Sequence, residues 1–208
     1  MKRALLICLS LVLALVGWST VGAEDGFYVI GGGGKSASVP KTGQTTSYGT
    51  RDDGALKKGV AWPTPRFTDN GNGTVTDNLT GLIWMKNTSS YDSDIWTNAL
   101  GTCNSLASPT PHLGLTDGSK AGDWRLPNIW ELQSLVDYER IGPALPAGHP
   151  LKNVQSTAGG PFSYYWSSTT NWAFARGLFA WVVNFHMGSG DPNEKINLGY
   201  VWCVRGGQ

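Results

Sequence analysis

The pattern of hydrophobic and polar positions divides the chain at about residue 60. Residues 24–60 are rich in Gly, Ser, Thr and Lys and offer few aliphatic side chains to bury, which is typical of a flexible extension. From residue 61 onward short apolar runs alternate with turn-forming clusters, and every tryptophan except Trp18 falls in this part. The pattern predicts one folded domain over residues 61–208, with short strands joined by long loops.

Five short strands are predicted in that domain. The β-forming runs Thr74–Thr76 and Leu82–Met85 flank the turn sequence Asp77–Gly81, which predicts a hairpin. Three later strands are predicted at Tyr164–Ser168, Phe179–Phe185 and Gly199–Arg205. In the middle one every second residue is large and apolar, which predicts a half-buried strand.

Two helices are also predicted. Asp94 is a candidate N-cap for a segment with apolar residues near helical spacing at Ile95, Ala99, Leu100, Cys103 and Leu106. A second helix begins after Asn128, which forms a capping box with Glu131 three residues later. Its apolar face comprises Ile129, Leu132, Leu135 and Val136.

The N-terminal segment has the pattern of a secretory signal peptide. Lys2 and Arg3 precede the apolar run Ala4–Val16, and small residues lead to Ala23. We therefore predict a signal over residues 1–23, cut after Ala23. The run is shorter than a membrane span, so the mature chain is expected to have no stable span, with a retained anchor as the alternative. The protein is expected to be exported, to a periplasm, a cell surface or the extracellular space.

Charge and cysteine content narrow the classes of partner. The chain has 16 Lys and Arg against 15 Asp and Glu, and two of the basic residues lie in the signal, so the mature chain is nearly neutral. This argues against nucleic acid or another polyanion held by bulk charge. The mature chain keeps Cys103 and Cys203, which in an exported protein most simply form one disulfide. Two free thiols or a catalytic pair are the alternatives.

Two stretches have the composition of ion or active sites. In DNGNGTVTD, Gly71 and Gly73 occupy positions where a calcium loop that begins at Asp69 needs oxygen ligands, so a hairpin is favoured over an ion site. The marker Asp123–Arg125 is interpreted as structural, with Trp124 in the core.

No catalytic motif is evident. Ser167 and Ser168 lack a glycine elbow, and the histidines His112, His149 and His186 stand in unrelated contexts. No pair of histidines has metal-ligand spacing, so neither catalysis nor a metal site is predicted.

The late loops are the candidate binding region. Thr169–Gly177 and His186–Gly199 are polar loops, and the candidate ligand-binding residues in them are Asn171, Trp172, Arg176, His186, Asp191, Asn193 and Glu194. Sugars bind on an aromatic face with planar amides or carboxylates at their hydroxyls, and these residue types offer both. The alternative is that Trp172 packs on the sheet. Asp191–Glu194 resembles a sugar-binding calcium site without its usual partner motif, so calcium is a lesser alternative and no other cofactor is expected.

Five ordered segments resemble the marker segments of the Lcl C-terminal domain family, a bacterial family named for the terminal domain of a collagen-like adhesin. They read PRFTDNGNGTVTDNLTGLIW, DWRLPNIWEL, YWSS, FAWVVNF and YVWCVRGG. The resemblance implies an α+β, C-type-lectin-like domain, with two helices packed on short, mostly antiparallel strands and long loops. It also implies a Cys103–Cys203 bridge.

The resemblance further implies an adhesin-like module that recognises an extracellular glycan or a surface protein. The alternatives are a structural or assembly component of an exported surface structure, and an oxidase of the formylglycine-generating type. The oxidase alternative needs reactive cysteines, whereas Cys103 is expected on the core face of a helix. We therefore predict that the protein is not an enzyme.

Overall fold

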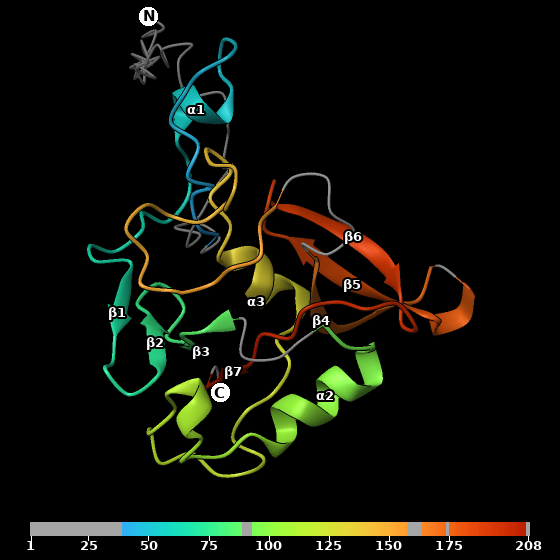
Figure 1. The fold of residues 1–208 in the computed structure, drawn as a ribbon. Helices are drawn as coiled ribbons and strands as arrows, with labels where there is room; N and C mark the ends of the chain where they lie inside the picture. Colours follow the sequence, from blue (N-terminus) through green and yellow to red (C-terminus); the bar gives the residue numbers. More distant parts are fainter. Residues whose placement is uncertain (1–38, 89–92, 158–163, 174, 207–208) are drawn as a thin grey trace, which may run out of the picture. The chain divides into compact units, whose positions relative to one another are not determined.

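The structure is a computed structural model that describes residues 39–88, 93–157, 164–173 and 175–206. These residues belong to one compact unit, Ala37–Gln208, and the predicted signal peptide lies outside them. The described part holds three α-helices and two antiparallel sheets, which confirms the α+β class (Figure 1). The C-type-lectin-like assignment stays a prediction. Nowhere in the described ranges is there a helix with the length and apolar character of a membrane span.

The first sheet confirms the predicted hairpin and adds a strand on each side of it. Its strands are β1 (Phe67–Asp69), β2 (Thr74–Asp77), β3 (Ile83–Met85) and β7 (Val204–Arg205), in the order β1-β2-β3-β7. In β2 and β3, Val75 lies opposite Trp84, and both side chains are fully buried. This cross-strand pair anchors the sheet to the core.

The last predicted strand, Gly199–Arg205, is shorter than expected because the segment joins the two sheets. Tyr200 exchanges backbone hydrogen bonds with Tyr164 and Trp166 in the second sheet, and only Val204 and Arg205 pair with β3. A single strand would require pairing with one sheet along its whole length.

The second sheet contains one strand that the sequence did not predict. Its strands are β4 (Tyr164–Asn171), β5 (Phe179–Asn184) and β6 (Ser189–Glu194), in the order β4-β5-β6. The segment of β6, SGDPNE, was expected to be a polar loop, and that expectation is wrong. Pro192 is compatible with β6 because the strand lies at the edge of the sheet, where a missing N–H breaks no ladder.

The burial of β5 differs from the simple alternation predicted for it. Ala180 and Val182 are fully buried, whereas Phe179 and Trp181 are only partly buried. Further along, Val183 is buried as well. In the first half of β5 the smaller side chains therefore face the core. In the second half the side chains on both faces of the strand are buried.

The two predicted helices are present but shorter than predicted, because the first ends before Leu106 and the second before Leu135 and Val136. Helix α3 (Ile129–Ser134) begins with the complete Asn128–Glu131 capping box, as predicted. Helix α2 (Trp96–Ser105) has Ile95 rather than Asp94 as its N-cap. The Asp94 carboxylate instead accepts hydrogen bonds from the Ile95 N–H and from the side chain of Asn98. Asp94 therefore still satisfies polar groups of the first turn.

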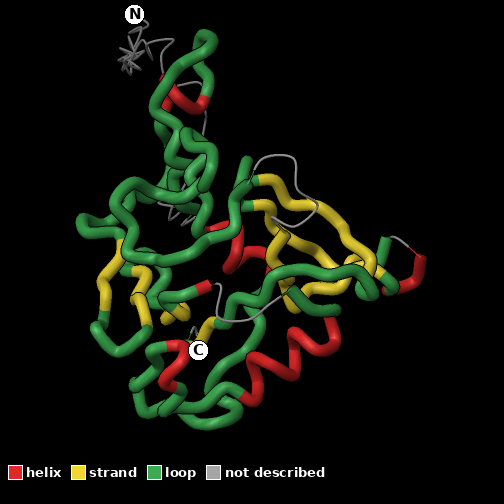
Figure 2. Tube along the Cα trace, in the orientation of Figure 1, coloured by secondary structure: helices red, strands yellow, loops and turns green. Residues whose placement is uncertain are grey.

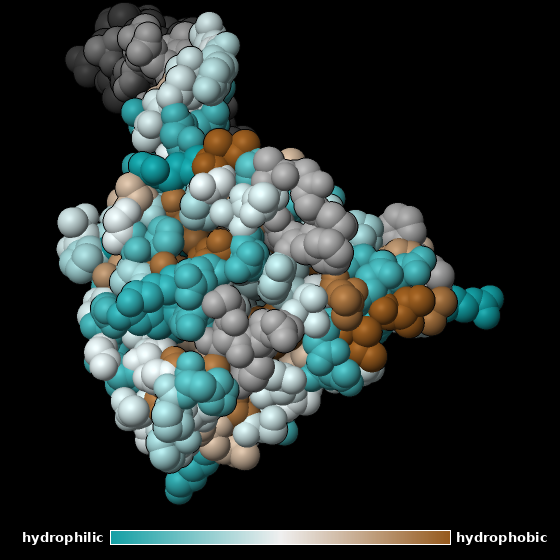
Figure 3. Space-filling view, viewed as in Figure 1, coloured by the Kyte–Doolittle hydropathy of each residue, from teal (hydrophilic) through white to brown (hydrophobic). Residues whose placement is uncertain are grey.

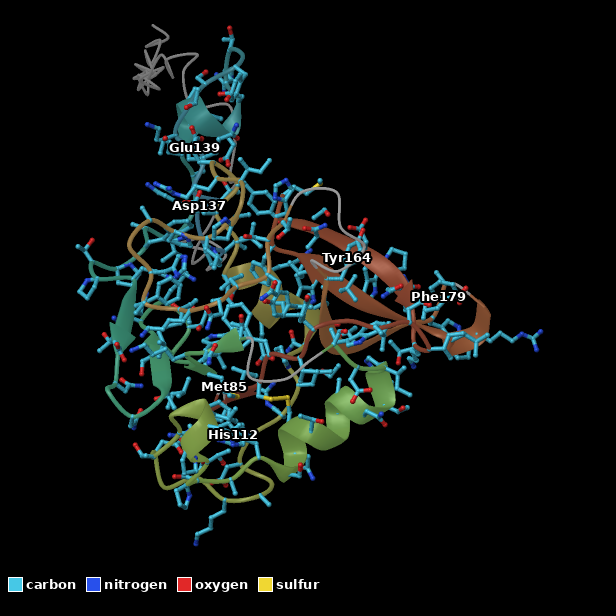
Figure 4. All side chains as sticks on the ribbon, in the orientation of Figure 1. Met85, His112, Asp137, Glu139, Tyr164 and Phe179 are labelled. Carbon is cyan, nitrogen blue, oxygen red and sulfur yellow. A yellow bond between two sulfur atoms is a disulfide. The ribbon has the colours of Figure 1, made fainter. Side chains whose placement is uncertain are left out.

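One disulfide joins α2 to the end of the chain. Cys103 and Cys203 are both fully buried and bonded, which confirms the predicted bridge, drawn as a yellow bond in Figure 4. Beside Cys203, the ring of Trp202 packs edge-on against Trp84 at 5.3 Å, and its indole N–H donates to the Met85 carbonyl. The bridge is thus built into the aromatic core.

Residues 39–60, which we call the N-terminal strap, were expected to be a flexible extension, but they contact the rest of the unit. The strap is mostly loop and carries the short helix α1 (Asp53–Leu56) (Figure 2). The Thr42 carbonyl accepts a hydrogen bond from the Tyr138 N–H, and the Lys41 carbonyl accepts one from the Trp62 indole. The strap therefore lies against the loop that follows α3.

Candidate functional site

The end of the second sheet brings residues of both late loops together. Strand register places Asn171 at the end of β4 opposite Phe179, and Phe179 in turn opposite Glu194 at the end of β6. Phe179 is labelled at this end of the sheet in Figure 4. The connection between β4 and β5 contains the 3-10 turn η3 (Ala175–Gly177).

Three large apolar side chains are exposed at this end of the sheet, and we call them the tip cluster. Trp172 is 75% exposed, Leu178 66% and Ile196 77%. Figure 3 shows hydrophobic surface, in brown, at the same end of the sheet. A hollow of about 240 Å³ lies there, lined in part by Leu178, Phe179 and Ile196.

The tip cluster stands on a backbone that is fixed to α2. Lys195 donates its N–H to the Leu178 carbonyl and accepts a hydrogen bond at its own carbonyl from the Trp96 N–H. The Lys195 ammonium lies 3.9 Å from the centre of the Trp96 ring and donates to the Thr170 hydroxyl at 2.8 Å. A cation held on an aromatic face adds about 0.5–1 kcal/mol at such exposed sites. The backbone beside Leu178 and Ile196 is therefore bonded to α2 through Lys195.

The candidate residues of the first late loop have different environments. Trp172 is exposed rather than packed in the core, and Arg176 is exposed with a left-handed φ of 52°. Asn171 is 3% exposed, and its side-chain oxygen accepts the Ala173 N–H at 2.9 Å. The Asn171 amide oxygen is thus used to close its own turn.

The candidates of the second late loop do not converge on one point. Because Asp191 to Glu194 belong to β6, side chains alternate between the two faces, and Asp191 points to the opposite face from Glu194. Asp191 accepts the Ser189 hydroxyl, and the Asn193 oxygen accepts the Asn197 amide. Across the described ranges, no group of three or more His, Cys, Asp or Glu side chains is arranged to hold a metal.

His186 lies at the other end of the second sheet. It follows β5, next to the β5–β6 turn, whereas Asn171 and Glu194 mark the opposite end. Its ring Nδ1 is 2.7 Å from the Ser156 carbonyl, and its backbone carbonyl accepts the Gly142 N–H. The structure thus separates His186 from the other candidates.

Sequence reasoning found Glu194 but missed Leu178, Lys195 and Ile196, which also line the hollow at the tip. A usable signal was present, because Ile196 is a β-branched aliphatic residue inside the polar run NEKINLG. Large apolar residues in a polar loop either enter the core or form an exposed patch. Only the position of β6 decides between these two outcomes.

The Asp123–Arg125 marker has the structural role that its sequence indicates. Trp124 is fully buried, and its indole N–H donates to the Ser119 hydroxyl. Arg125 does not pair with Asp123 but binds both carboxylate oxygens of Glu131, at 2.7 and 2.6 Å. That carboxylate also completes the capping box of α3, so one ion pair fixes the start of the helix.

The Glu131 carboxylate makes stability depend on pH. Burial opposes its ionisation, but hydrogen bonds from Arg125 and the Asn128 N–H outweigh burial and lower its pKa below the ordinary 4.5. A lowered folded pKa stabilises the fold above pH 4.5, and this contribution is lost as the pH falls through the folded value. We expect Glu131→Gln to cost about 1 kcal/mol at pH 7, because the pair is partly solvent-screened.

Urea unfolding of wild type and Glu131→Gln at several pH values checks this expectation. The difference in the free energy of unfolding should shrink below pH 4.5. If the difference in the free energy of unfolding stayed constant down to about pH 2.5, which is about two pH units below the ordinary pKa of 4.5, the charge of Glu131 would not contribute to the cap.

The nucleophiles weighed in the sequence are engaged in the fold. Ser167 is fully buried, and its hydroxyl donates to the Trp181 carbonyl. Cys103 and Cys203 form the disulfide. The expectation that the protein is not an enzyme stays a prediction.

Comparison with known proteins bears on the family. No curated protein shows significant similarity to this chain. The model of the Lcl C-terminal domain matches residues 73–205, which is more than half of the chain and includes both sheets except β1. The chain therefore belongs to the Lcl C-terminal domain family.

Proposed function

We propose that the domain is an exported, adhesin-like binding module that docks a partner protein through the tip cluster. The observation that carries the proposal is the exposure of Trp172, Leu178 and Ile196 at one end of the second sheet. Contiguous exposed apolar side chains on a soluble domain mark interaction surfaces. The buried disulfide supports an oxidising, exported setting.

A protein partner fits the site better than a glycan. The hollow of about 240 Å³ is smaller than the roughly 300–1,000 Å³ of small-molecule pockets and suits a single apolar side chain. A glycan needs free planar amides beside an aromatic face, whereas the Asn171 and Asn193 side-chain oxygens accept hydrogen bonds within the domain. Glycan recognition is therefore an outcome of the test rather than part of the proposal.

The expected affinity is modest. Burying a side chain of this size contributes about 1.5–3 kcal/mol, and association costs at least about 4 kcal/mol in lost freedom of motion. The tip cluster alone is thus enough for weak binding. A surface module with many copies gains strength from multivalency.

The combined substitution Trp172→Ala and Ile196→Ala tests the proposal. We expect at least a tenfold loss of binding, because each truncation removes apolar area from the contact. The stability should stay within about 0.5 kcal/mol of wild type, since both side chains are exposed. The measurement is saturable binding of labelled mature protein to intact cells of the producing organism.

Matched controls come from elsewhere on the domain. Trp130→Ala with Ile141→Ala removes residues that are 76% and 69% exposed, outside the tip cluster, and should leave binding unchanged. Protease treatment of the cells should abolish binding, and periodate should not. Loss of binding after periodate but not after protease would indicate a glycan partner. Equal losses of binding in the two double variants would show that the tip cluster is not the binding site.

A further inference from the structure

A second cavity lies between the N-terminal strap and the loop that follows α3. Its volume is about 510 Å³, which is within the range of small-molecule sites. The strap contributes Lys41 and Lys57 to its wall, and the loop contributes Asp137 and Glu139, which are labelled in Figure 4. No residue of the tip cluster lines it, so the inference is independent of the proposed function.

Arg66 forms part of the cavity wall and is paired with Asp77. The side chain is only 7% exposed, and its Nε and Nη2 atoms contact the Asp77 carboxylate at 2.8 and 3.1 Å. Nη2 also donates to the Ser134 carbonyl, whereas Nη1 is buried and has no hydrogen-bond partner among the described residues. Because Nη1 is buried from solvent, Arg66 contributes its positive charge to the wall rather than a hydrogen-bond donor to the cavity.

The charges around the cavity favour an anionic acceptor. Its cations are Lys41, Lys57, Arg66 and Arg140, and its carboxylates are Asp137 and Glu139. Asp77, which pairs with Arg66, adds a third carboxylate next to the wall. The four cations still exceed the three carboxylates by one positive charge. Within the described ranges, no carboxylate lies in ion-pair contact with Lys41 or Lys57, so both ammonium groups are available.

The two carboxylates of the wall are already hydrogen-bonded within the protein. Glu139 accepts the N–H groups of Thr45 and Thr46, and these bonds, with the Thr46 hydroxyl, lower its pKa. Asp137 accepts the Glu139 N–H and pairs with Arg140. Glu139 therefore helps to hold the strap, and Asp137 is paired within its own loop, so both carboxylates are already engaged.

The remaining wall is apolar and aromatic. Trp62 is partly buried, holds the Arg66 guanidinium 4.9 Å from its ring centre and is fixed by its indole bond to Lys41. Pro63, Pro146 and Ala147 line the same space. A ligand with a flat apolar body and one anionic end would bury its body here and place its charge near the cations.

From this geometry we infer that the strap cavity binds a small organic carboxylate with an apolar body, whose charge lies near the ammonium groups of Lys41 and Lys57. The strap and Arg66 precede residue 73, where the family match begins, whereas the loop that forms the other wall lies within the match.

Three probes separate the features of this ligand class: benzoate has both the charge and the ring, benzamide has only the ring, and acetate has only the charge. We expect saturable shifts of the Trp62 indole N–H in NMR spectra of the mature protein with benzoate. Acetate should bind at least tenfold more weakly because it lacks the apolar body, and benzamide should not bind. Equal binding of benzamide and benzoate would overturn the carboxylate assignment.

Two pairs of variants locate the site without touching the buried Arg66–Asp77 pair. Ala147→Trp fills the cavity and should weaken benzoate at least tenfold, whereas Ala121→Trp, at an exposed position elsewhere, should not. Lys41→Gln with Lys57→Gln should weaken benzoate, and the charge-matched Lys58→Gln with Lys120→Gln should leave it unchanged. Unaltered binding by Ala147→Trp, or no saturable shift with any probe, would overturn the inference.

Discussion

Replacing both Cys103 and Cys203 with alanine is expected to lower the free energy of unfolding by about 2–5 kcal/mol. The bridge closes a loop with a sequence separation of 100, so its loss returns a large conformational entropy to the unfolded chain. Without the bridge, the end of the chain is still held by the two residue pairs of β7 with β3 and by backbone bonds between Val204 and Arg125, so a loss of the fold's stability rather than of the fold is expected. Urea unfolding of the mature protein measures the loss.

Reductant supplies the matched control for this variant. Wild type unfolded in urea with dithiothreitol should lose a similar free energy of unfolding, and the double alanine variant should be insensitive to it. Without reductant, unfolded wild type should show no free thiol. A double variant as stable as wild type would mean that the aromatic core around Trp202 holds the terminus by itself.

The elements that the sequence predicted correctly are those with local signals. The Asn128–Glu131 capping box identifies the first turn of α3 in the sequence, because both of its hydrogen bonds form within four residues. The β2–β3 hairpin was legible because β-forming residues flank a turn sequence on both sides. In such places local preference and tertiary packing agree.

The elements that were missed depend on distant partners. SGDPNE has no strand signal, and β6 exists only because β5 presents a free edge to it. The strap has little to bury, and its order depends on polar contacts with Glu139 and Tyr138, more than ninety residues away. No local pattern in the strap encodes those partners.

The candidate site was therefore only partly predictable. The sequence indicated Trp172 and Arg176 because an aromatic side chain and a cation in one polar loop are typical of a binding site. Leu178 and Ile196 become a surface only when β5 and β6 pair. His186 was grouped with them because it begins the second late loop. It lies at the far end of β5, however, so the full length of that strand separates it from the tip.

The second large effect is expected at the buried ion pair of the first sheet. Asp77→Ala should lower the free energy of unfolding by about 3–5 kcal/mol, because Arg66 would remain as a buried cation without its carboxylate. The substitution also removes the acceptor of the Leu79 N–H and the Thr80 hydroxyl, which hold the β2–β3 turn. Urea unfolding at pH 7 measures the change.

Asp69→Ala is the matched control, since Asp69 is the aspartate at the end of the neighbouring strand β1. Its carboxylate pairs with Lys86, but the side chain is 38% exposed, and water screens the pair. Its loss should cost less than about 1 kcal/mol. Similar losses in the two variants would contradict the argument, because they would show that burial of the Arg66–Asp77 pair does not set its importance. A large loss confined to Asp77→Ala would show that the buried Arg66–Asp77 pair, and not the exposed Lys86–Asp69 pair, stabilises the first sheet.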